Sequence, residues 1–90
     1  MTLTIAQLSA VHDKLPTLPK GERPGYFIIG ITPVLASLDD EDLPNTVYRF
    51  DSKQGVFVSD LSMSMDIMFS HDTRRVSVEE FTKAVHDLSN

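Results

Sequence analysis

The sequence predicts an α+β fold, in which a mostly antiparallel sheet of about four strands lies between one helix near each end of the chain. Three observations support this prediction. Residues 46–60 have the pattern of a β-hairpin, residues 26–31 form a short apolar run, and capping signals begin a helical pattern at both ends. A chain of 90 residues has the size of one domain, so we expect residues 1–90 to form a single domain whose helices cover one face of the sheet.

The hairpin is predicted from two segments, 46–51 and 56–60, that are rich in β-branched and aromatic residues. The loop between them ends at Gly55, which can adopt the left-handed conformation without steric cost. A three-residue loop that ends in such a glycine is common in hairpins, and here it would pair Phe50 with Val58.

Burial predicts the register of this hairpin. The three-residue loop places four apolar side chains on one face, namely Tyr48, Phe50, Val56 and Val58. A register shifted by one residue would pair Phe50 with Phe57 and divide the apolar side chains between the two faces. Because burying all four contributes roughly 6–12 kcal/mol of transfer free energy, we expect the first register.

Two further strands are predicted. Residues 26–31 are a continuous apolar run, which is typical of a central strand buried on both faces, and Gly30 within it indicates a bulge or a close approach. Residues 62–70 continue an alternation of apolar and polar side chains that begins at Leu61, and this favours a strand with one exposed face. The alternative is a short helix capped by Asp60. One side of that helix would carry Leu61, Met65 and Met68.

The N-terminal helix is predicted over residues 5–15. Thr4 and Gln7 have the spacing of a capping box, and Pro16 ends the helix because proline disfavours a helical residue before it. The helix has an apolar stripe with helical spacing, made of Ile5, Leu8, Val11 and Leu15.

The C-terminal helix is predicted over residues 78–88. Ser77 and Glu80 form a second capping box, and Glu79 lies with Glu80 where the helix dipole favours negative charge. The inward stripe of this helix would consist of Val78, Phe81, Val85 and Leu88.

Three segments connect these elements. Residues 16–25 contain three of the five prolines and are predicted as a connecting loop. Residues 32–45 leave three structures open: a short helix that starts at Thr32-Pro33, a turn of helix at 38–43, or an edge strand through 34–36. Residues 71–75 are predicted as a polar turn.

The composition excludes several classes of protein. The chain has no cysteine, which excludes disulfides, thiolate metal sites and cysteine catalysis. A net charge of −5 and a pI of about 4.9 disfavour nucleic acid and anionic membranes as direct partners. Because neither a signal peptide nor a membrane-spanning apolar stretch is recognised, we expect a cytoplasmic location, which for a phage-encoded protein is the host cytoplasm.

Each of the three histidines is followed by an aspartate, in the pairs His12-Asp13, His71-Asp72 and His86-Asp87. A base beside a carboxylate suits triad chemistry, but adjacent residues do not face each other on a helix or a strand. A zinc site would need ligands to converge from both ends of the chain. The sequence also has no phosphate-binding glycine loop and no nucleophile motif. We therefore expect no catalytic residue, no metal and no cofactor.

Two groups of residues are candidates for partner binding. The first is an acidic run that could contact a basic patch on a partner, made of Asp39, Asp40, Glu41 and Asp42. The second lies on the other face of the hairpin and has the residue types of binding hot spots, with Val47, Arg49 and Phe57. In the plainer interpretation, the acidic run is a solvated loop that caps a helix, and Phe57 is a residue of the core. The methionines Met63, Met65 and Met68 suit either an adaptable surface or a core.

These observations favour a small acidic, non-enzymatic interaction module that binds a larger protein or protein complex, as an inhibitor or an adaptor. Its size and charge agree with phage-encoded inhibitors of host machinery such as anti-CRISPR proteins, although no motif supports that assignment. The first alternative is a homo-oligomeric structural or assembly subunit, such as a dimer, that uses the same apolar face on itself. The second alternative is a small enzyme with a histidine–aspartate site.

Overall fold

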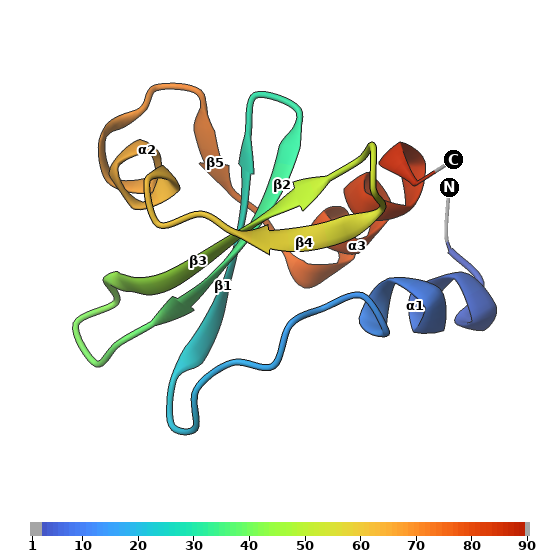
Figure 1. The fold of residues 1–90 in the computed structure, drawn as a ribbon, viewed down its shortest axis with the longest axis horizontal. Helices are drawn as coiled ribbons and strands as arrows, with labels where there is room; N and C mark the ends of the chain where they lie inside the picture. Colours follow the sequence, from blue (N-terminus) through green and yellow to red (C-terminus); the bar gives the residue numbers. More distant parts are fainter. Residues whose placement is uncertain (1–2, 90) are drawn as a thin grey trace.

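A computed structural model describes residues 3–89, in which five antiparallel strands form one sheet with helices on both faces (Figure 1). The helices are α1 (Ile5–His12), α2 (Met63–Phe69) and α3 (Val78–Leu88). The strands are β1 (Arg23–Ile29), β2 (Thr32–Leu38), β3 (Pro44–Asp51), β4 (Val56–Ser59) and β5 (Thr73–Arg75), and their order across the sheet is β4-β3-β2-β1-β5. The predicted α+β class is confirmed, with five strands in this part of the chain rather than four.

β1 and β2 are joined by a two-residue turn, Gly30-Ile31. Gly30 has a φ of 63°, which suits the first position of a type II′ turn and which glycine adopts without strain. The predicted bulge at Gly30 is therefore wrong, because the strand predicted at 26–31 ends where this turn begins. β1 also starts earlier than predicted and lies beside the edge strand β5 rather than at the centre of the sheet.

The segment 32–45 contains the central strand β2 and the loop that leads to β3. Of the three structures that the sequence leaves open, the strand is the one observed, but it does not lie at an edge. Its side chains are buried from Pro33 to Leu38. Pro33 is tolerated in this central strand because the pairing of β2 with β3 begins only at Val34. The hydrogen bonds between these two strands therefore require no N–H group from the proline.

β3 and β4 form the predicted hairpin, and Gly55 has the expected left-handed φ of 70°. The predicted register is wrong: Phe50 pairs with Phe57, and their ring centroids lie 5.2 Å apart. The loop is one residue longer than predicted, and Gly55 N donates a hydrogen bond to the Asp51 carbonyl at 2.7 Å. Because both faces of the sheet are covered, the apolar side chains do not need to gather on one face, as the predicted register assumed.

The core has one part on each face of the sheet. The cluster under α1 and α3 consists of Val11, Leu35, Phe50, Phe81 and Val85. The cluster under α2 consists of Phe27, Val34, Ala36, Leu38 and Val47. Met63 and Ile67 of α2 pack against this second cluster. The two terminal helices α1 and α3 cover one face, as predicted, but the other face is covered too, because α2 lies across the sheet from them (Figure 1).

Residues 62–70, predicted as a strand, instead contain the short helix α2. Met63 and Ile67, one helical turn apart, are its inner residues. Met65 between them and Phe69 two residues after Ile67 are exposed, so inner and outer side chains together produce the alternation expected of a strand, with Met68 as the exception. The segment is therefore a helix, as in the alternative prediction, but its N-cap is Ser62 rather than Asp60 and Leu61 lies in the turn before it. The side chains grouped on one side in that prediction, Leu61, Met65 and Met68, are exposed.

The polar turn predicted at residues 71–75 contains the short edge strand β5, which pairs with β1. None of the β5 side chains is buried. A three-residue strand without buried apolar side chains carries no alternation, so the sequence did not indicate it.

α1 begins with the predicted capping box, in which Gln7 N donates to Thr4 Oγ1 at 3.2 Å and Thr4 N donates to Gln7 Oε1 at 2.8 Å. It ends at His12, three residues before the predicted end. Val11 is the one buried residue of the helix, and Ile5 of the predicted stripe is 82% exposed. α1 is therefore only lightly attached to the core.

α3 spans the predicted residues 78–88, and Glu80 N donates a hydrogen bond to Ser77 Oγ at 3.2 Å, as expected of the N-cap. The predicted capping box is only half formed, because the Glu80 carboxylate accepts a hydrogen bond from Arg74 Nη1 at 3.1 Å rather than from Ser77 N. Phe81 and Val85 are fully buried, so the inner side of α3 is anchored in the core. Val78, predicted to face inward, is exposed.

Candidate interaction surface

α2 is attached to the sheet by its inner side and by the turn that precedes it. Met63 and Ile67 pack on the cluster beneath the helix. In the turn, the Asp60 carboxylate accepts hydrogen bonds from Ser62 N at 3.2 Å, from the Ser62 hydroxyl and from Arg49 Nε at 3.0 Å. Since Arg49 belongs to β3, these bonds hold the start of α2 against that strand.

The Ser62 hydroxyl is the main group that lowers the pKa of Asp60 below its ordinary value of 3.8. Partial burial of the carboxyl opposes this effect, and Arg49 adds to it. Asp60 is therefore ionised at neutral pH, where it pairs with the Arg49 guanidinium.

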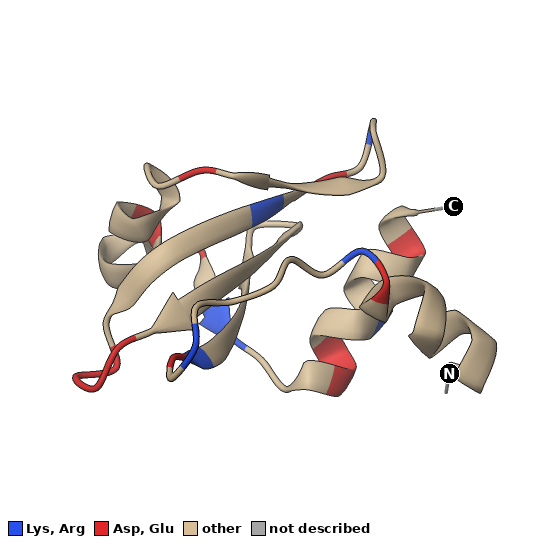
Figure 2. Cartoon of the chain, turned by 60° about the horizontal axis from the view of Figure 1, so that its bottom comes forward, with Lys and Arg blue, Asp and Glu red and all other residues tan. Residues whose placement is uncertain are grey.

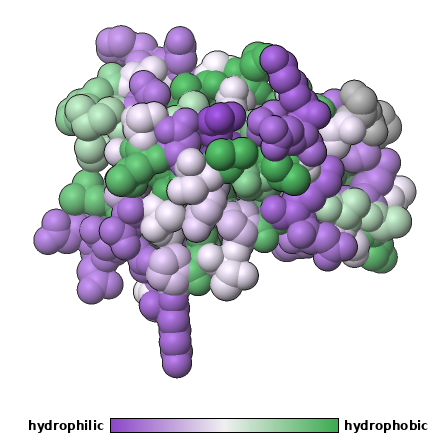
Figure 3. Space-filling model, viewed as in Figure 1, coloured by the Kyte–Doolittle hydropathy of each residue, from purple (hydrophilic) through white to green (hydrophobic). Residues whose placement is uncertain are grey.

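The outer side of α2 and the turn that precedes it carry four exposed apolar side chains, which we call the α2 outer face. Their exposed fractions are 63% for Leu61, 58% for Met65, 44% for Met68 and 69% for Phe69. Successive helical residues are turned by about 100°, so Met65 points directly away from Met63 and Ile67. In the space-filling view, apolar atoms reach the surface on the left, where α2 lies (Figure 3). A helix that is apolar on both sides is usually buried on both sides.

A shallow hollow of about 510 Å³ adjoins this outer face. It is lined by Met65, Asp66, Phe69, Ser70, His71 and Asp72. Two hydrogen bonds shape its wall: Thr73 Oγ1 donates to the Asp66 carbonyl at 2.7 Å, and Asp72 N donates to Ser70 Oγ at 3.2 Å. Apolar surface and two carboxylates therefore lie side by side in one concave region.

The hairpin residues proposed for partner binding are not brought together. Val47 is fully buried beneath α2, and Arg49, on the same face of β3, pairs with Asp60. Phe57 lies on the opposite face of the sheet, where its ring stacks on that of Phe81 with centroids 5.9 Å apart. These three residues do not form one surface patch.

The acidic run forms the loop between β2 and β3, at one end of the sheet (Figure 2). The Asp39 carboxylate stabilises the loop itself, because its Oδ1 accepts hydrogen bonds from Glu41 N at 2.9 Å and Leu43 N at 3.0 Å. No helix follows, so this residue caps a loop rather than a helix. Asp40 and Glu41 are exposed at the tip of the loop.

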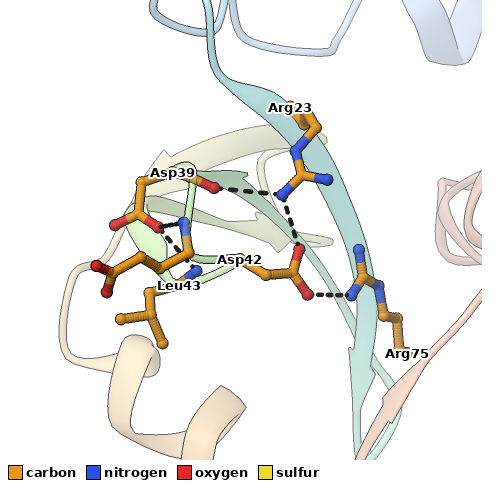
Figure 4. A network of polar contacts seen from close by, with 6 residues as sticks. Arg23, Asp39, Asp42, Leu43 and Arg75 are labelled. Atoms are coloured by element: carbon orange, nitrogen blue, oxygen red, sulfur yellow. Dashed lines mark hydrogen bonds and ion pairs between the residues drawn. The ribbon is translucent and has the colours of Figure 1, made fainter.

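Asp42 joins the same loop to two strands (Figure 4). Its Oδ1 lies 3.2 Å from Arg23 Nη2 in β1, and its Oδ2 lies 2.9 Å from Arg75 Nη1 in β5. Asp42 has a left-handed φ of 64°, which is uncommon outside glycine. Two of the four acidic residues are therefore engaged inside the protein and two are available to a partner.

The three histidines are distributed over both sides of the sheet. His71 lies in the hollow beside α2, whereas His12 and His86 belong to α1 and α3. His86 Nε2 lies 3.4 Å from Gln7 Nε2. Across residues 3–89, no three side chains of histidine, aspartate or glutamate come close enough together to hold a metal ion.

None of the four residues of the α2 outer face was among the predicted partner-binding residues, and the sequence left open whether Met65 and Met68 belong to an adaptable surface or to the core. The signal for them is the spacing of Leu61, Met65, Met68 and Phe69, which is that of one side of a helix. It becomes visible only when the segment is interpreted as a helix whose inner side is Met63 and Ile67.

No protein-family model, no curated protein and no solved structure matches this chain. Among the helices of residues 3–89, none combines the length and the apolar character that crossing a membrane requires. The chemistry of the surface itself is therefore what indicates a function.

Proposed function

We propose that this protein is a small, non-enzymatic binding protein that associates with a larger protein through the α2 outer face, as an inhibitor or an adaptor. The observation that supports this proposal is the exposure of four large apolar side chains on α2 and the turn before it, while the inner side of the helix is already packed. Such a group forms a patch on the order of several hundred Å², a size at which exposed patches on monomers are often functional.

The residue types of this face suit recognition. Met65 and Met68 have flexible, polarisable side chains that adapt to a partner, and Phe69 offers a large apolar surface for the centre of an interface. Removing such surface from water contributes roughly 25 cal/mol per Å², so a partner that covers this face gains free energy that the isolated protein does not.

Of the residues proposed from the sequence, Asp40 and Glu41 remain as secondary contacts, since both are exposed and near the end of the sheet. Val47 and Phe57 act in this proposal through the core, where they support the fold. The size and acidity of the chain agree with an inhibitor of the phage type, and the lack of cysteine agrees with a partner in a reducing cytoplasm.

Self-assembly is the second candidate function, because a second copy could cover the same apolar face. Sedimentation of the purified protein separates the two candidates. A monomer at micromolar concentration supports binding to another protein, whereas a dimer that dissociates on substitution of Met65 supports self-assembly.

The test is affinity capture from a lysate of the cells that produce the protein, followed by quantitative mass spectrometry. The variant Met65→Gln/Phe69→Gln replaces two exposed apolar side chains by glutamine, a polar residue with a similar preference for helix. The matched control, Ile5→Gln/Val78→Gln, makes the same change on α1 and α3, on the other face of the sheet.

We expect the wild type and the control to capture the same partner and the α2 variant to lose most of it, with all three melting at similar temperatures. Equal capture by the α2 variant and the wild type would refute this proposal. So would loss of capture in the control alone.

A further inference from the structure

We infer that the occupant of the α2 outer face is a basic amphipathic helix of the partner protein, whose apolar side packs on the four exposed residues and whose Lys or Arg side chains pair with Asp66 and Asp72. This inference rests on the proposed function, because it specifies the partner for the same surface. Three observations favour such an occupant: the charge at the edge of the face, the spacing of its apolar side chains, and the charge of the whole chain.

The first observation is that the carboxylates beside the face are uncompensated. Asp66 and Asp72 line the hollow together with Met65 and Phe69, and both are exposed. The four ion pairs among the described residues involve neither of them.

The cations nearest in sequence are already engaged. Arg74 pairs with Glu80 at 3.1 Å, and Arg75 pairs with Asp42 at 2.9 Å. The Arg75 guanidinium also lies over the Phe27 ring, 5.7 Å from its centroid. The region therefore offers unpaired negative charge next to apolar surface, which complements a partner that is apolar in the middle and basic at its edges.

The second observation is the spacing of the apolar side chains. Within α2, Met65 lies three and four residues before Met68 and Phe69, which is the spacing of neighbours on one side of a helix, and the exposed Leu61 belongs to the turn just before α2. Away from its ends, a helix bonds its backbone N–H and C=O groups internally, so the side of α2 offers no row of unpaired groups for an added β-strand. An amphipathic helix that lays its apolar side on these side chains and the hollow is a common mode of peptide recognition that fits this face.

The third observation concerns a second copy of the chain. Each copy carries a net charge of −5. In a dimer with two-fold symmetry around α2, Asp66 and Asp72 would meet the same residues of the other copy or lie close to them. Like charges at the edge of an interface oppose association, so the charge favours a basic partner over self-association.

The test uses two synthetic, fluorescently labelled peptides of about 18 residues, which corresponds to five helical turns. Both place leucine at i, i+3, i+4 and i+7 positions, and their polar positions hold lysine in one peptide and glutamate in the other. Fluorescence anisotropy then gives the affinity of the full-length protein for each peptide at low and at high salt.

Three variants identify the contributing side chains. Met65→Gln/Phe69→Gln alters the apolar face, and Asp66→Asn/Asp72→Asn removes the adjacent charge. Asp13→Asn/Asp87→Asn removes the same charge on α3 and beside α1, across the sheet, and is the matched control. Circular dichroism verifies that each variant retains the fold.

We expect the lysine peptide to bind at least about tenfold more tightly than the glutamate peptide, since complementary charge at an interface favours the right partner. The Met65→Gln/Phe69→Gln variant should bind the lysine peptide with about tenfold lower affinity than the wild type, as expected for loss of central anchors. The Asp66→Asn/Asp72→Asn variant should lower the affinity for the lysine peptide by about threefold to tenfold at low salt and make that affinity less dependent on salt. The control variant should change the affinity by less than about twofold.

Equal weakening by the Asp66/Asp72 variant and the control would overturn the inference, because it would show attraction by net charge alone. Binding of both peptides with equal affinity, each dependent on Met65 and Phe69, would also overturn it while leaving the proposed function intact. A dimer in sedimentation that excludes the peptides would assign the face to a second copy and refute the basic partner. A failure of the proposed function itself is recognised separately, because the Met65→Gln/Phe69→Gln variant would then capture the partner from the lysate as well as the wild type does.

Discussion

At the scale of single residues, Gly55 ends the loop between β3 and β4 with a φ of 70°. Beyond Gly55 itself and its two neighbours in the chain, no heavy atom lies within 4 Å of the position that a Cβ atom would occupy there. A side chain at this position therefore meets open space, and its cost is the strain of a left-handed backbone. A substitution at Gly55 therefore measures the backbone requirement of the loop without a contribution from packing.

We predict that Gly55→Ala lowers the free energy of unfolding by about 1 kcal/mol, because alanine resists a positive φ. Asparagine enters the left-handed region more readily, so Gly55→Asn should cost clearly less. Urea denaturation of the three proteins measures both differences. An alanine variant as stable as the wild type would contradict the assigned loop conformation.

Asp60 gives the fold a pH dependence whose sign follows from its environment. Its pKa is lowered in the folded protein, mainly by the Ser62 hydroxyl, so its contribution to stability is fully present above the unfolded value of 3.8. That contribution is lost as the pH falls through the folded pKa, which lies below 3.8.

We predict that Asp60→Asn lowers the melting temperature at pH 7 and that its deficit relative to the wild type shrinks as the pH falls below 3.8. The control is Asp40→Asn, in an exposed loop. Thermal melts from pH 2 to pH 7 measure the effect. A deficit that is constant over this range would contradict the role assigned to the Asp60 charge.

Several residue-scale features could be predicted from the sequence because they depend on neighbours three or four positions away. The caps at Thr4 and Ser77 and the glycine at position 55 belong to this class. The pairing of Phe50 with Phe57 could not be predicted in this way, because the choice of register depends on whether a distant segment covers the second face of the sheet.

At the scale of elements, the two terminal helices differ in how firmly they are held. α3 buries Phe81, Thr82 and Val85, whereas α1 buries Val11. Polar contacts also join the two helices and the residues at their ends: Gln7 Nε2 lies 3.4 Å from His86 Nε2, and Lys14 Nζ donates a hydrogen bond to Ser89 Oγ at 3.0 Å. Segments with few buried contacts open locally at lower free energy than the core.

We predict that the backbone amides of α1 exchange with deuterium at least about tenfold faster than those in the middle of α3, because opening α1 exposes little core. Hydrogen exchange followed by mass spectrometry or NMR measures the difference. Equal protection of the two helices would show that α1 and α3 open together.

α2 shows why its segment was assigned the wrong structure. Its inner pair, Met63 and Ile67, and its outer residues alternate in the sequence, so that the pattern has a period of two although the backbone is helical. Periodicity assumes that one side of an element is apolar. It fails for an element that has apolar side chains on both sides, which is also the feature that makes α2 the candidate binding element.

At the scale of the whole molecule, five antiparallel strands place α2 on one face of the sheet and α1 with α3 on the other. The α+β class and both terminal helices could be predicted because they follow from composition, local patterns and caps. The proposed interaction surface could not be located from the sequence, because it depends on which side of α2 faces the sheet. The Arg23–Asp42–Arg75 contacts, between residues far apart in the sequence, were likewise absent from any local pattern.

The arrangement also suggests a division of roles across the molecule. The cluster under α1 and α3 holds most of the aromatic packing, with Tyr26, Phe50, Phe57 and Phe81 in contact. On the other face, α2 is shorter than α3, is rich in methionine and has one exposed side. Changes to its exposed residues should therefore alter binding while leaving the fold intact, which allows the two properties to be tested separately.

The most direct test of this account is the rate at which hydrogen peroxide oxidises each methionine of the native protein, measured by mass spectrometry after digestion. If α2 packs through Met63 and leaves its other side to a partner, Met65 and Met68 oxidise several-fold faster than Met63 in the free protein. Oxidation of Met63 at the same rate or faster would contradict the orientation of α2 on which the interaction surface depends.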